Sequence, residues 1–124
     1  MVQDNVLAKL NNDDLRVYVV WTPVLREDNR TAAGQSAAYI TDTRAVHFWD
    51  EDKSLGRSFG KLVTLPRQRE LAWDVYFVFG TDAVWTESPP TPADWMHQLG
   101  VDERLFDGDK LRASVEKLLS IPAQ

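Results

Sequence analysis

The sequence contains no cysteine at any of its 124 positions. Disulfide exchange, thiol-peroxidase turnover and thiolate metal binding all need a cysteine sulfur, so the chain alone can perform none of them. The two methionines cannot replace that sulfur, because a thioether has no proton to lose. We therefore expect the protein to have no thiol redox activity.

Basic clusters, long apolar runs and targeting segments are also missing. Acidic residues outnumber basic ones by 19 to 14, and no Lys/Arg cluster offers the basic patch that nucleic acids require. No apolar run approaches the roughly 20 residues of a membrane span, and the first residues lack the pattern of a signal peptide. We expect a cytoplasmic protein that binds neither nucleic acid nor membrane.

The usual signatures of enzymes and nucleotide-binding proteins are absent as well. The six glycines are dispersed and form neither a phosphate-binding loop nor a dinucleotide fingerprint. No serine lies in a Gly-x-Ser-x-Gly turn. We expect no cofactor. What the chain does contain is a hydrophobic fraction of 44% with five tryptophans, which indicates one globular domain over residues 1–124.

Hydrophobic patterning predicts an α/β chain. The strands at 15–21 and 72–79 are the most continuously apolar, so we expect them to be the inner strands of a sheet. The predicted helices span about residues 2–10, 33–40, 55–63, 92–100 and 111–119. The predicted strands cover 15–21, 45–49, 72–79 and 83–85.

Two local signals decide how the second half of the chain is interpreted. The turn-forming run Gly-Thr-Asp at 80–82 predicts a hairpin between the strands at 72–79 and 83–85. Thr91 with Asp94 resembles a capping box, and Pro92 suits the first position of a short helix that ends near Gly100.

The order of these elements resembles the part of a thioredoxin-like, peroxiredoxin-related domain that follows its redox motif. The resemblance covers most of residues 1–100 and implies a thioredoxin-like α/β fold, with a central mixed sheet and a C-terminal hairpin flanked by helices. The matching runs are His-Phe-Trp-Asp at 47–50, Leu-Gly at 55–56, Phe-Gly at 59–60, the hairpin start at 73–80, and Trp-Met-His-Gln-Leu at 95–99, which is similar to the ending of a bacterial branch.

Two departures from this family shape the functional prediction. The strand bearing Cys-x-x-Cys, which is central in the family, would precede residue 1, and Ala-Trp at 72–73 stands where the family has a cis-proline. With that strand lost, either 15–21 pairs directly with 72–79, or a second chain fills the gap. We therefore expect a non-catalytic module that associates with a partner protein, most simply as a homodimer.

The family topology also implies a candidate binding site, because ligands favour strand ends in α/β folds. Its expected members are Trp21, Asp50, Trp73 and Asp74, which would form an apolar pocket with polar handles. Alternatively, the tryptophans complete the core. Asp74 is either a base or cation ligand with a raised pKa, or a cap for local backbone N–H groups. Asp50 is expected to cap the helix that follows it.

The two histidines are secondary members of the site. With Asp50 or Asp74, His47 and His97 would supply a two-histidine, one-carboxylate set for a metal, although nothing in their spacing requires one. His97 lies on a predicted helix and is expected to point away from the core. The alternative function is therefore a small ligand- or metal-binding protein or enzyme, and a further alternative is a fragment of a thiol oxidoreductase.

Overall fold

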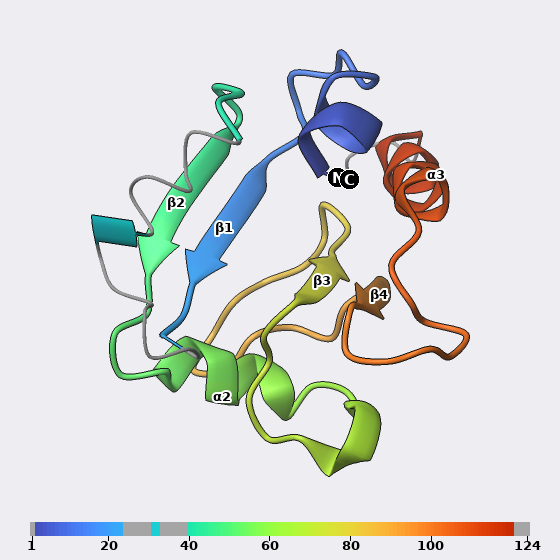
Figure 1. Ribbon diagram of the computed structural model, residues 1–124. Coiled ribbons are helices and arrows are strands. Elements are labelled where there is room, and N and C mark those ends of the chain that lie inside the picture. Colours follow the sequence, from blue (N-terminus) through green and yellow to red (C-terminus); the bar gives the residue numbers. More distant parts are fainter. Residues whose placement is uncertain (1, 24–30, 33–39, 121–124) are drawn as a thin grey trace.

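The computed structural model describes residues 2–23, 31–32 and 40–120, and it has a mixed α/β architecture (Figure 1). The helix expected at 33–40 falls almost entirely outside these residues. The elements in chain order are the short helix η1 (Gln3–Leu7), strands β1 (Val17–Trp21) and β2 (Ala45–Trp49), helix α2 (Ser54–Gly60), the 3₁₀ turn η3 (Pro66–Gln68), strands β3 (Val75–Val78) and β4 (Asp94–His97), and helix α3 (Gly108–Leu119).

The strands form two separate two-stranded sheets. β1 and β2 run parallel, with Val17 opposite Ala45, whereas β3 and β4 run antiparallel, with Val75 opposite His97. Among the described strands no ladder joins β1 to β3. The two apolar strands β1 and β3 therefore do not pair directly, which was one of the two expected arrangements. The prediction of a single central sheet is wrong, because the strands form two sheets.

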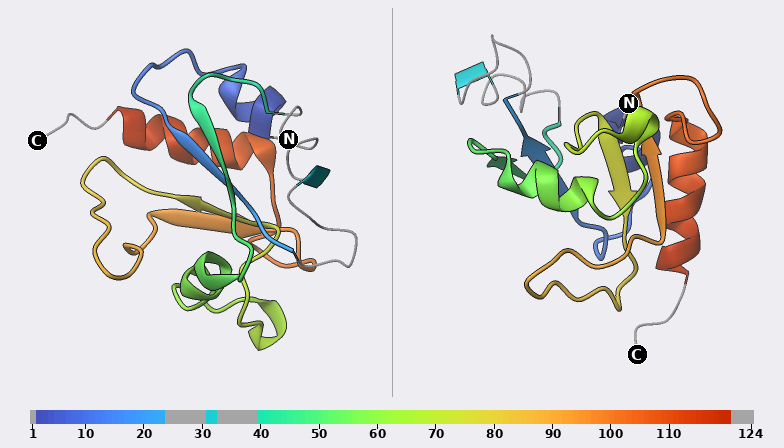
Figure 2. Two further views of the ribbon diagram at one scale, coloured as in Figure 1. Left: turned by 90° about the vertical axis from the view of Figure 1, so that its left-hand side faces the viewer. Right: turned by 90° about the horizontal axis from the view of Figure 1, so that it is seen from below.

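The four strands nevertheless lie in a simple spatial order. Figure 1 and the right-hand view of Figure 2 place them as β2, β1, β3 and β4 across the molecule. β1 and β2 run toward α2, whereas β3 begins at that end and runs the opposite way. The C-terminal ends of β1 and β2 and the start of β3 thus share one end of the molecule, as the resemblance implied.

The main hydrophobic core lies where η1, the second sheet and α3 meet. Four buried side chains form its centre: Val6, Val78, Met96 and Leu111. On α3, Leu111, Val115 and Leu118 repeat at helical spacing and face this cluster, as predicted. Asp107 caps the start of this helix, because its carboxylate accepts the N–H groups of Asp109 and Lys110 at 3.0 and 3.1 Å.

A second group of side chains joins α2 to β3 and the chain that follows it. Phe59 of α2 lies 5.1 Å from Phe77 and 5.5 Å from Trp85 between ring centroids. α2 also approaches the segment before β3 closely, since the Ala72 N–H donates to the Gly56 carbonyl at 2.9 Å. A side chain at Gly60 would overlap the backbone at Glu70.

One arginine connects the first sheet to η1. The Arg44 guanidinium, just before β2, donates to the carbonyls of Leu7 and Asn12 at 2.7 and 3.0 Å and pairs with Asp42 at 2.8 Å. This hydrogen bonding lowers the pKa of the Asp42 carboxyl to about 2. Arg44 thus satisfies the Leu7 carbonyl at the end of η1 and the Asn12 carbonyl in the loop that follows.

Two predictions for the second half of the chain are wrong. Residues 83–85 form no strand, and the side chains of Val84 and Trp85 are 70% and 52% exposed. The partner of β3 is β4, which occupies the middle of the predicted 92–100 helix. Tertiary packing overrides the local turn and cap signals here, because Met96 on β4 is buried in the hydrophobic core.

The helices of the structure are short. Within residues 2–23, 31–32 and 40–120, none is long and apolar enough to cross a membrane.

Candidate functional site

Trp21 and His47 lie side by side on β1 and β2, as members of the predicted strand-end site. Their rings stack with centroids 6.1 Å apart, and the Trp21 Nε1–H donates to Nδ1 of His47 at 3.1 Å. Because Nδ1 accepts this bond, Nε2 carries the ring proton and donates it to the Ile40 carbonyl at 3.0 Å. Both ring nitrogens are engaged, so His47 has no lone pair to offer a metal.

Asp50 has the structural role that the sequence predicted. Its side chain is buried and accepts the N–H groups of Gly56 and Leu55 at 2.9 and 3.3 Å, together with the Ser54 hydroxyl at 3.4 Å. These donors belong to the first turn of α2, where backbone N–H groups have no helical partner. The carboxylate is therefore occupied in holding α2 at the end of β2.

Trp73 and Asp74 lie immediately before β3. The Arg69 guanidinium lies 5.6 Å from the centroid of the Trp73 ring. Asp74 has a left-handed backbone with φ of 52°, and in the described part of the chain its carboxylate accepts no hydrogen bond. The interpretation of Asp74 as a local cap is therefore wrong. Desolvation by its surroundings raises the pKa of the Asp74 carboxyl.

The predicted site is thus partly assembled. Trp21 lies next to His47, and the Trp21 carbonyl accepts the Asp50 N–H at 2.8 Å. Asp74 belongs to the other sheet, where its carbonyl accepts the Gln98 N–H at 2.8 Å. Across the residues that the structure describes, no three His, Asp or Glu side chains are close enough to hold a metal ion. This geometry does not favour the metal-binding alternative, and binding at the strand ends stays a prediction.

His97 is placed differently from its prediction. It lies on β4 and is fully buried, with 0% of its side chain exposed. Its Nδ1 accepts the Leu99 N–H at 3.0 Å, so Nε2 carries the proton and contacts both Asp102 carboxylate oxygens at 2.9 and 3.0 Å. The His97 backbone also bonds Arg104 and Phe106. His97 therefore fixes the loop at 98–106 against β4.

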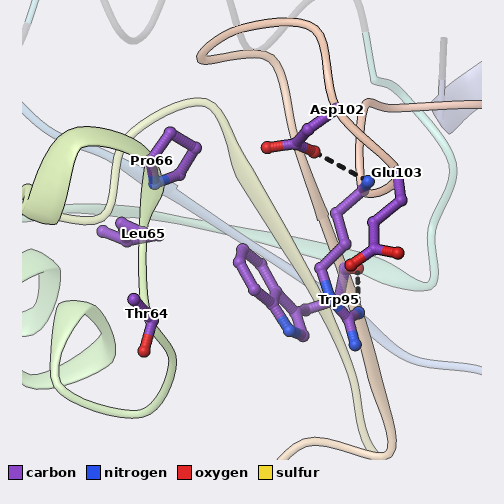
Figure 3. A pocket seen from close by; sticks show the side chains of 7 residues that line it. Thr64, Leu65, Pro66, Trp95, Asp102 and Glu103 are labelled. Atoms are coloured by element: carbon purple, nitrogen blue, oxygen red, sulfur yellow. Dashed lines mark hydrogen bonds between the residues drawn. The ribbon is translucent and has the colours of Figure 1, made fainter.

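This loop forms one wall of a pocket that sequence reasoning missed (Figure 3). The pocket has a volume of about 680 Å³, with Trp95, Asp102, Glu103 and Arg104 on one side and residues 64–66 on the other. One signal could have indicated it. A histidine within the apolar run at 95–99 needs a polar partner once it is buried, and Asp102 lies five residues further on.

The electrostatics of the pocket are set by its own loop. The Arg104 backbone N–H donates to Asp102 at 2.8 Å and, with the His97 bond, lowers the pKa of the Asp102 carboxyl. The Arg104 guanidinium lies 4.7 Å from the centroid of the Trp95 ring. The pocket thus combines an ionised carboxylate with an aromatic surface.

A different feature lies between the two sheets. In β1, the Val17 N–H and the Trp21 carbonyl bond toward β2 at 3.1 and 2.8 Å, so the peptide groups of the alternate residues Tyr18 and Val20 face the opposite edge. In β3, the carbonyls of Asp74 and Val78 bond toward β4. The alternate residues of β3 at 75 and 77 therefore face β1.

The outer surface of the first sheet is apolar and exposed. The side chains of Tyr18, Val46 and Phe48 are 66%, 45% and 45% exposed. The rings of Tyr18 and Phe48 contact each other with centroids 6.2 Å apart. An exposed aromatic pair beside an unpaired strand edge is typical of an interaction surface.

Comparison with models of protein families, with curated proteins and with solved structures finds no match to this chain.

Proposed function

We propose that the protein is a non-catalytic, thioredoxin-like module that associates with another protein chain, most simply a second copy of itself. The observation that supports this function is the pair of facing, unpaired strand edges on β1 and β3. The absence of cysteine removes the thiol chemistry that this fold usually performs.

An added strand would fit the geometry of these edges. β1 and β3 run in opposite directions, so a strand between them would be parallel to one and antiparallel to the other (Figure 1). It would pair with the free peptide groups on both sides and join the two small sheets into one of five strands. Strand addition of this kind gains main-chain hydrogen bonds and is a common way of binding a partner.

The exposed aromatic pair would strengthen the contact. A stable interface buries at least roughly 1,000 Å² in total, and large aromatic side chains supply much of that area. Tyr18 belongs to both features, because its peptide group faces the free edge and its ring lies on the exposed surface. It is therefore the residue whose replacement should affect association most.

The test is to measure molecular mass by sedimentation velocity from micromolar to millimolar concentration. We expect the mass to rise from 14.1 kDa toward twice that value. Tyr18→Lys should weaken association by about tenfold or more, because a lysine on an edge strand opposes pairing.

The matched control is Val84→Lys, which places the same charge on a 70% exposed apolar residue outside any strand. This variant should associate as the parent does. A mass that stays at 14.1 kDa over the whole range would refute self-association. Equal weakening by the two lysine variants would show that net charge, and not the strand edge, controls assembly.

A further inference from the structure

We propose that the pocket between residues 64–66 and the 98–106 loop binds an alkylammonium group, with the charge at Asp102 and the alkyl stem against Trp95 (Figure 3). This site is separate from the strand edges and does not depend on the association proposed above.

The Asp102 carboxylate is held in one orientation and can still accept further hydrogen bonds. His97 contacts both of its oxygens at 2.9 and 3.0 Å, and the Arg104 backbone N–H donates to one of them at 2.8 Å. The side chain is still 46% exposed, so lone pairs remain for a ligand. A carboxylate fixed by a buried partner loses little conformational freedom when it binds a cation.

The charge of the pocket favours a cation over an anion. Among the described residues that line it, Arg104 is the only basic one, and its guanidinium donates to the Trp95 carbonyl at 3.0 Å and lies 3.4 Å from the Asp94 carboxylate. Glu103 has no ion-pair partner within the described chain, and it adds a second negative charge at the rim. With Arg104 neutralised by Asp94, the lining carries a negative balance.

The remaining walls favour an organic cation over a metal ion. Leu65, Pro66 and Trp95 supply an apolar surface along an open depression of about 680 Å³. A hard metal ion needs several converging oxygen ligands, whereas only one carboxylate here is held in place. The Arg104 guanidinium lies over the Trp95 ring, 4.7 Å from its centroid, so an alkyl stem would pack against the rest of the ring surface.

The ammonium could belong to a free amine or to a lysine side chain of a peptide. We would titrate the protein with hexylammonium chloride, with hexanol as a neutral analogue, and with Nα-acetyl-lysine methylamide. Calorimetry and tryptophan fluorescence would report binding. We expect millimolar affinity for hexylammonium and affinity at least about tenfold weaker for hexanol.

The variants address the charge directly. Asp102→Asn should weaken hexylammonium binding by about tenfold or more, and Glu103→Lys should weaken it because it places a cation at the exposed rim. Glu87→Gln removes one exposed negative charge elsewhere and should leave the affinity unchanged. Circular dichroism would check that each variant folds. If Asp102→Asn does not fold, the hexylammonium affinity of Glu103→Lys tests the proposal by itself.

The two model ligands distinguish a free amine from a lysine side chain as the source of the ammonium group. Binding of hexylammonium alone would assign the site to free amines, and binding of the lysine derivative as well would assign it to lysine side chains. The proposal is overturned if wild-type protein binds neither ligand, if hexanol binds equally well, or if folded Asp102→Asn or Glu103→Lys retains full affinity.

Discussion

Replacing Asp50 with alanine should destabilise the protein strongly, although the residue lies in a region first predicted to bind ligands. The carboxylate is 5% exposed and accepts the Gly56 N–H at 2.9 Å and the Leu55 N–H at 3.3 Å. Losing a helix cap costs about 0.5–2 kcal/mol, and a buried N–H left without a partner costs about 1–3 kcal/mol. We expect a loss of about 2–4 kcal/mol in the free energy of unfolding.

Urea denaturation followed by tryptophan fluorescence would measure this loss. With a slope of about 2 kcal/mol/M, the midpoint should fall by about 1–2 M. Asp50→Asn keeps an oxygen acceptor and should lose less. Glu51→Ala removes the neighbouring exposed carboxylate and serves as the control. A midpoint for Asp50→Ala equal to that of Glu51→Ala would refute the capping argument.

Two further predictions concern the same end of the molecule. Gly60→Ala should cost about 1–3 kcal/mol more than Gly56→Ala, because its methyl group would meet the rigid Glu70 backbone. The methyl group of Gly56→Ala would instead meet the side-chain tip of Leu71 at 2.5 Å, and the Ala72 carbonyl oxygen lies at an ordinary contact distance of 3.4 Å. Equal urea midpoints for the two alanine variants would contradict this. Asp74→Asn should raise the melting temperature slightly at neutral pH, because partial desolvation raises the folded-state pKa of this exposed residue's carboxyl and so disfavours its charged form. The gain should vanish below about pH 4, where the carboxyl is protonated in the folded and unfolded states, and a large loss at neutral pH would show that the carboxylate stabilises the fold.

The sequence predicted elements well where a local pattern and the tertiary environment agree. The strand expected at 45–49 coincides with β2, and the helix over 111–119 coincides with most of α3. In both, the apolar residues repeat with the period of the element that forms. The capping role of Asp50 was predictable for the same reason, because a helix begins four residues after it, at Ser54.

The errors occurred where local signals competed with long-range packing. The Gly-Thr-Asp turn at 80–82 favours a tight hairpin, but β3 pairs instead with a strand that begins at Asp94. Residues 95–99 fit a helical face and also fit strand alternation, and only the core around Met96 decides between them. The Asp102 pocket depends on that strand, because the His97 side chain reaches Asp102 from β4.

The core around Val6 also constrains how the chain can fold as it is synthesised. Val6 packs with Val78, Met96 and Leu111, and the Arg112 guanidinium donates to the Asn5 carbonyl at 3.4 Å. At about 5–20 residues per second, a ribosome needs on the order of ten seconds to add the partners of η1. The apolar side chains of η1 therefore stay without their native packing partners during that interval.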